Sequence, residues 1–170
     1  TPVAIAGTSQ NVNLTTGRGT TGNFNVAASA YPDVRVRIRF PVVAPTVTSC
    51  STDNFAIRPT GFTVTSTDAT QTGTSGAIPP PIKTGENFNL TATAIAGYNG
   101  TPIFNPAPGL VVGTPNAGAL GGSFGAAPVG TGIATGNSFY YSEVGNFGLN
   151  TDAVIDTGFT AVDQPGDCVS

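Results

Sequence analysis

The spacing of apolar residues is the feature that most constrains this chain. Apolar and polar residues alternate in short runs, and the three-and-four spacing of an amphipathic helix is almost absent. Many of the 23 glycines and 14 prolines, together with asparagines, stand between these runs as turn signals. Because a period of two is the period of a strand, the pattern predicts an all-β protein. The predicted strands are residues 11–16, 23–30, 34–40, 61–67, 87–96, 101–105, 137–143, 146–151 and 153–162.

Many short strands at intervals of roughly ten residues are typical of a β-sandwich. Proline interrupts residues 40–50, which indicates a crossover or linker, and the triple proline at 79–81 favours an extended polyproline II segment. We expect residues 1–49 to be N-terminal strands, either the end of a preceding β unit or strands added to the main one. We expect residues 50–170 to form an immunoglobulin-like β-sandwich.

One motif supports that expectation. Glu143, Gly145, Phe147 and Leu149 alternate in the order acid, glycine, aromatic, apolar. This spacing matches the entry to the sixth strand of many immunoglobulin-like domains, where an aromatic ring packs at the corner. Phe147 stands where tyrosine is usual, so a corner hydrogen bond from a hydroxyl is not expected.

Four segments together resemble the MshQ-like proteins: YPDVRVRIRFP, CSTDNFAIRPTGFTV, GENFNLTATAIAGYNGTPIFN and YYSEVGNFGL. These are large bacterial surface proteins associated with mannose-sensitive haemagglutinin type IV pili. The resemblance is to part of their C-terminal domain of unknown function and runs from about residue 30 to 150. It implies an extracellular, pilus-linked or adhesion-related β module whose partners are other surface or pilus proteins. It implies no catalytic residues.

Composition excludes several classes of function. Only 9 % of residues are charged, the net charge is −3, and six basic residues are too few to track nucleic-acid phosphates. The longest apolar runs are far shorter than a membrane span. A chain that begins with Thr1 and contains no methionine is expected to be a processed product or a fragment of a longer protein.

The two cysteines, Cys50 and Cys168, are expected to form a disulfide. A catalytic thiol needs a base, and two cysteines without any histidine cannot complete a zinc site, so no metal or other cofactor is expected. In a secreted protein, a disulfide closing a loop of this size contributes about 4–5 kcal/mol in the chain-entropy model. Bonding to a neighbouring chain, or to cysteines outside this sequence, is the alternative.

The sequence Asp156-Thr157-Gly158 is the strongest enzymatic signal, because it resembles the aspartic-protease signature. That chemistry needs two carboxylates that share a proton, and the chain has one such triplet, followed by Phe159 where serine or alanine is usual. We therefore interpret it as a strand with a turn or bulge at Gly158, and we expect no enzyme.

Two further groups are candidate contact residues. Alternation in residues 34–40 places Arg35, Arg37 and Arg39 on one face of a strand, either as an ordinary solvent-facing side or as a stripe that binds an anion or a partner. Tyr140 and Tyr141 are the one aromatic cluster suited to a glycan contact. Arg58 is expected to pair with Asp53 or Glu143.

The leading hypothesis is a non-catalytic extracellular module that presents, spaces or attaches. The first alternative is a self-assembling fibre subunit, in which a segment such as residues 8–30 adds a strand to a copy of itself. The second alternative is a carbohydrate-binding module, which the lack of tryptophan weakens.

Overall fold

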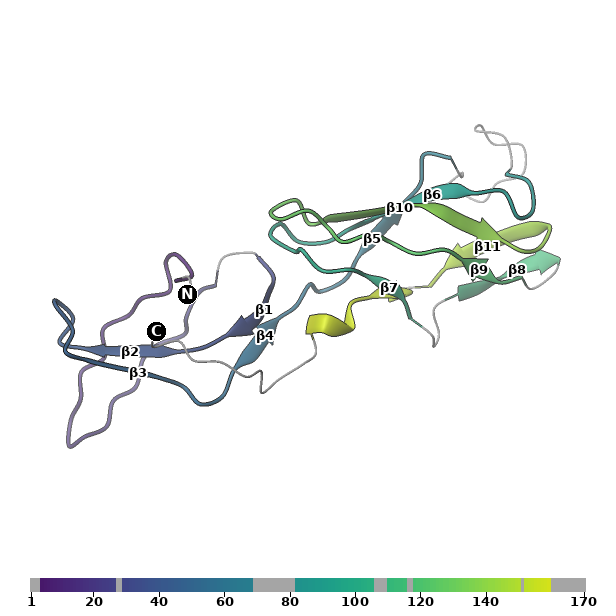
Figure 1. Ribbon diagram of the computed structural model, residues 1–170. Coiled ribbons are helices and arrows are strands. Elements are labelled where there is room, and N and C mark those ends of the chain that lie inside the picture. The colour runs from purple at the N-terminus through teal and green to yellow at the C-terminus, as the bar shows by residue number, and fades with distance from the viewer. Residues whose placement is uncertain are drawn as a thin grey trace.

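The computed structural model describes residues 4–26, 29–68, 82–105, 110–115, 118–150 and 152–159. Within these ranges the chain is all-β, as predicted, with small antiparallel sheets of two or four strands, one short 3-10 helix and no α-helix. The same residues contain no helix long and apolar enough to cross a membrane. Figure 1 shows β2 and β3 at the opposite end of the molecule from β8 and β11.

The largest sheet has four strands in the order β5-β6-β10-β9. Its strands are β5 (Thr63–Thr65), β6 (Phe88–Thr93), β10 (Ile133–Tyr141) and β9 (Leu120–Gly121). Side chains of β6 alternate as the sequence predicts, with Phe88, Leu90 and Ala92 buried and the polar residues between them partly exposed. This sheet therefore turns one apolar face inward.

Two pairs of shorter strands lie in line with each other beside that sheet. β8 (Leu110–Pro115) pairs with β11 (Gly145–Leu149), and β7 (Ile103–Phe104) pairs with β12 (Val154–Ile155). The register continues from one pair to the other, because the residue numbers of paired residues add up to nearly the same sum in both. The segment that contains β7 and β8 therefore runs antiparallel to the segment that contains β11 and β12. We call these two long, interrupted segments passes of the chain. The 3-10 helix η1 (Thr157–Phe159) follows β12.

The N-terminal part has two pairs of its own. β1 (Tyr31–Val34) pairs with β4 (Phe55–Ile57), and β2 (Arg37–Phe40) pairs with β3 (Val47–Cys50). The expected linker at 40–50 is therefore wrong, because its second half is a strand of the β2–β3 hairpin. The predicted boundary after residue 49 falls inside β3, and strand pairing instead changes between β4 and β5.

Neither of the first two predicted strands is found among the described residues. In 11–16 the chain turns at Thr16 and Gly17, both with positive φ, and Thr15 pairs with Arg18 across the turn. The described residues of 23–30 lie outside strands as well. Alternation alone does not make a strand: Val12, Leu14 and Phe24 are exposed, so they provide no buried face that would fix a register.

Other boundaries also moved. The strand predicted at 34–40 breaks at Arg35 and Val36, and the one predicted at 153–162 is strand only in β12, although part of that range lies outside the described residues. Sequence patterns did not predict β8 or β9. The strands expected within 61–67, 87–96, 101–105, 137–143 and 146–151 are confirmed with shifted ends.

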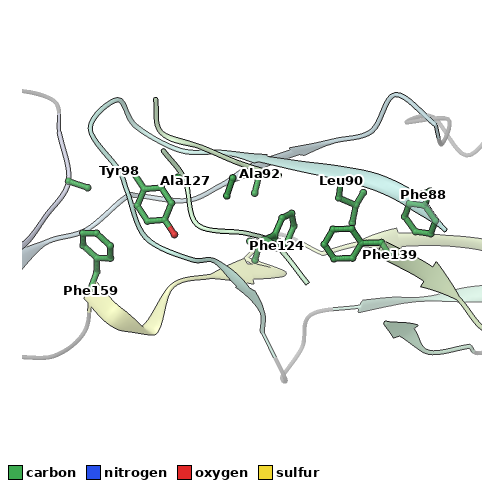
Figure 2. Close-up of a cluster of buried hydrophobic side chains, with 11 residues drawn as sticks. Phe88, Leu90, Ala92, Tyr98, Phe124, Ala127, Phe139 and Phe159 are labelled. Carbon is green, nitrogen blue, oxygen red and sulfur yellow. The ribbon is translucent and has the colours of Figure 1, made fainter. Parts of the chain in front are cut away.

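Aromatic rings connect the four-stranded sheet with the strands β7 and β12 beside it. Phe139 of β10 is fully buried, and its ring centroid lies 6.3 Å from Phe88, 5.5 Å from Phe104 and 4.8 Å from Phe124. Figure 2 shows the buried side chains as a row between the strands, with Phe88 and Phe139 toward one end and Phe159 at the other. The interior is therefore built from rings interleaved with alanines such as Ala92.

Glycine allows the chain to approach this row closely. Gly122 has φ +108°, and a Cβ there would come within 2.6 Å of the Phe139 Cα. A side chain at this position would therefore be strained and would push the chain after β9 away from β10.

We predict that Phe139→Ala lowers the free energy of unfolding by about 3–5 kcal/mol, because it leaves a cavity between ring partners. Urea denaturation followed by circular dichroism measures this, with Phe139→Leu as the milder change. Phe55→Ala is the control, because Phe55 is 46 % exposed, and it should cost much less. Equal losses at both positions would contradict the role assigned to Phe139.

Candidate functional site

The most distinctive polar contact joins Tyr98 to Asp156. The Tyr98 hydroxyl donates a 2.6 Å hydrogen bond to Asp156 Oδ2, and the Tyr98 ring is fully buried. Its ring packs against Phe159 and against Phe62, with centroids 5.4 and 5.2 Å apart. Burial raises the pKa of Tyr98 well above its usual value of 10.0, and the hydrogen bond and charge of Asp156 raise it further.

This contact assigns a structural role to the Asp-Thr-Gly motif. The second carboxylate oxygen of Asp156, Oδ1, accepts a 2.7 Å hydrogen bond from the Gly158 amide. One oxygen therefore binds Tyr98 and the other holds the turn into η1, as expected for an aspartate at a turn. The sequence predicted a turn at Gly158 but not the tyrosine, because the two partners are 58 residues apart and no local period connects them.

The structure leaves the disulfide untested. Cys50 ends β3, and no free cysteine occurs among the described residues. Cys168 lies outside those residues, so its pairing with Cys50 stays a prediction.

The three arginines do not form one stripe. Arg37 and Arg39 are exposed on the same face of β2, opposite Cys50 and Thr48 of β3. Arg35 lies in the break between β1 and β2, where its side chain is only 10 % exposed and its Nε lies 3.5 Å from Asp33 Oδ1. The possible anion or partner contact is therefore left to Arg37 and Arg39.

Arg58 is exposed and has no acidic partner within 4 Å among the described residues, so the expected pairing with Asp53 or Glu143 is not found in this part of the chain.

Tyr140 and Tyr141 do not form one surface either. As neighbours in β10 they point to opposite faces, and Tyr140 is 42 % exposed whereas Tyr141 is 6 % exposed. The Tyr141 ring stacks on Phe147 with centroids 4.6 Å apart, and its hydroxyl accepts a hydrogen bond from the Gly118 amide. Tyr141 is thus an interior residue, and Tyr140 remains as a single candidate for glycan contact.

A small pocket of about 130 Å³ lies beside β7, lined by residues 101–104 and 122–124. Its lining offers the hydroxyls of Thr101 and Ser123 but no titratable side chain. No group of three His, Cys, Asp or Glu residues in the described ranges could hold a metal ion.

No protein-family model, curated protein or solved structure matches the chain. The resemblance to MshQ-like proteins therefore remains an expectation based on the sequence.

We predict that Tyr98→Phe lowers the free energy of unfolding by about 1–2 kcal/mol near neutral pH, because it removes a hydrogen bond to a charged acceptor. Tyr140→Phe is the matched control and should change little.

The same pair of variants tests the pKa of Tyr98. The unfolded tyrosine loses its proton near pH 10, whereas the folded one keeps it, so this contribution to stability is complete below pH 10 and declines above it. Above pH 10, the free energy of unfolding of the original protein should fall by about 1.4 kcal/mol per pH unit more than that of Tyr98→Phe. Urea denaturation of both proteins between pH 8 and pH 11, in steps of about one pH unit, measures this difference in stability. Parallel losses in both proteins would mean that Tyr98 titrates normally.

Proposed function

We propose that this chain is a non-catalytic, load-bearing module of an extracellular bacterial surface protein, built on an immunoglobulin-like sandwich. The observation that carries the proposal is the order β5-β6-β10-β9, which corresponds to the A-B-E-D sheet of an immunoglobulin domain. The passes β7–β8 and β11–β12 then correspond to strands C and F.

The link between β10 and β11 supports this assignment. Ser142, Glu143 and Val144 alone separate β10, in the large sheet, from β11, which pairs with β8. Phe147 follows the turn, stacks on Tyr141 and contacts Phe88 with centroids 5.9 Å apart. An aromatic ring that anchors the chain where it changes sheets is the arrangement expected from the acid-glycine-aromatic spacing.

The roles of the polar groups support a structural function rather than catalysis. Asp156 is committed to Tyr98 and Gly158, and Asp68 accepts a hydrogen bond from the Asn89 amide at the start of β6. Glu86 accepts one from the Lys83 amide in the preceding turn. These carboxylates stabilise turns and strand ends.

The location outside the cell and the link to pili rest on the resemblance to MshQ-like proteins. Other surface or pilus proteins are the partners that this resemblance implies. Tyr140, exposed on β10, is the residue that supports carbohydrate binding as the second candidate function.

Single-molecule pulling from the two ends tests the load-bearing role. With the Cys50–Cys168 disulfide intact, we predict that the enclosed loop does not extend. Reduction should release roughly 118 residues, or about 400 Å, in one cooperative event with a force peak. Serine at both cysteine positions is the control and should give the full extension without reductant.

Full extension of the oxidised chain would contradict the intrachain disulfide. Gradual lengthening of the reduced chain, with no force peak, would contradict the load-bearing role.

A further inference from the structure

The turn after β6 contains the one Asn-Gly dipeptide of the sequence, Asn99-Gly100. Asparagine is a thermolabile residue, and it is most reactive before glycine, because glycine has no side chain that hinders the approach of its backbone nitrogen to the asparagine side chain. Asn99 is exposed, and both residues lie outside the strands. The dipeptide is therefore accessible to water and is not held in a ladder of backbone hydrogen bonds.

The two groups that would react with each other are not occupied by hydrogen bonds. Within the described ranges, neither the side chain of Asn99 nor the amide N–H of Gly100 has a hydrogen-bond partner. The contact recorded for Gly100 is made by its carbonyl, which accepts a 2.9 Å hydrogen bond from the Ala127 amide. No hydrogen bond therefore has to break before the Gly100 nitrogen approaches the Asn99 side chain.

Packing requires glycine at position 100. A Cβ there would overlap Asp156 Oδ2 and would lie 2.8 Å from the ring and from the hydroxyl oxygen of Tyr98. Asp156 and Tyr98 are the partners of the buried hydrogen bond described above. The fold places this pair against the main chain at Gly100, so the same contact that needs glycine also keeps Asn99 in its reactive context.

We propose that Asn99 is a site of spontaneous covalent modification. The Gly100 nitrogen loses its proton to hydroxide and attacks Asn99 Cγ, so that a C–N bond forms and the side-chain nitrogen leaves as ammonia. Water then adds to one of the two carbonyls of the resulting cyclic succinimide and opens it to aspartate or to isoaspartate. The reaction uses only hydroxide and water and needs no enzyme, oxidant or cofactor.

Isoaspartate lengthens the main chain between two anchored residues. Its backbone runs through Cβ and Cγ, which adds one carbon between Tyr98 and Gly100. The Tyr98 amide donates a 3.2 Å hydrogen bond to the Ile95 carbonyl, and its hydroxyl donates the 2.6 Å bond to Asp156. Gly100 is held by Ala127. Because a longer link cannot keep all these contacts at their present geometry, the modification weakens the end of the core that Tyr98 closes.

The same turn contacts the N-terminal part of the chain. A Cβ at Gly97 would lie 3.0 Å from Ser29, two residues before β1. The Tyr98 ring packs against Phe159, and Ala30 belongs to the same buried cluster. The modification therefore acts where the N-terminal strands meet the four-stranded sheet. It does not depend on the load-bearing role, because the chemistry follows from the turn alone.

Peptide mapping by mass spectrometry tests the proposal. The oxidised full chain is incubated in mildly alkaline buffer beside a synthetic peptide of residues 95–103, which serves as the unfolded reference. We expect aspartate and isoaspartate to accumulate at position 99 of the folded chain before they do so at any other asparagine. The rate should rise with hydroxide concentration, as in the peptide.

Two variants serve as controls for the chemistry. Asn99→Gln should give no product at position 99 over the same time, because glutamine would have to close a larger ring. Asn137 also precedes a small residue, Ser138, but lies within β10. Asn137→Gln should therefore leave the rate at Asn99 unchanged.

Urea denaturation tests the effect on the Tyr98 anchor. The isoaspartate form, separated by ion exchange because it carries an additional negative charge, should unfold at a lower urea concentration than the fresh protein. Fresh Asn99→Asp carries the same charge without the extra carbon and should keep its midpoint. Tyr98→Phe should lose less on conversion than the original protein, because its anchor is already weakened.

Three results would overturn the proposal. The first is an intact Asn99 in the folded chain after the peptide has been converted, because the fold would then protect the site. The second is a product that appears first at another asparagine. The third is conversion at Asn99 with an unchanged urea midpoint, which would contradict the effect on Tyr98. None of these results bears on the load-bearing role.

Discussion

The packing of Phe139 between two groups of strands is the contact on which the rest of the structure depends. Its ring meets Phe88 from the four-stranded sheet, Phe104 from β7 and Phe124 from the segment after β9. The strands around it are short and their pairings interrupted, so backbone hydrogen bonds alone would not hold β7 and β12 against the large sheet. Aromatic rings bury a large area and pack among alanines here, and they stabilise this core as aliphatic side chains do in many other proteins. Gly122 is necessary because any side chain there would collide with Phe139.

Polar contacts secure the ends of this interior. At one end Tyr98 and Asp156 join the turn after β6 to the turn after β12, and at the other Asn89 and Asp68 hold β6 beside the chain after β5. The β2–β3 hairpin takes no part in the buried cluster, so its apolar side chains stay exposed.

The sequence predicted the all-β class and the strands that bury alternate residues, because burial of one face fixes the register of strands such as β6. It predicted a strand at 11–16 wrongly, because Val12 and Leu14 alternate there without being buried against another element. Burial of Tyr141 beside an exposed Tyr140 follows from strand geometry once β10 is known, because Tyr141 lies two residues after the buried Phe139 and shares its face. The pairing of Tyr98 with Asp156 could not be predicted, because it depends on how distant turns meet.

Proximity of aromatic rings in solution tests the account most directly. With selectively labelled phenylalanine, nuclear Overhauser effects should connect the Phe139 ring with the rings of Phe88, Phe104 and Phe124. The Phe88 contact checks the sheet itself, and the Phe104 contact checks that the second group of strands packs onto it. A spectrum with the first contact but without the second would contradict the shared aromatic core.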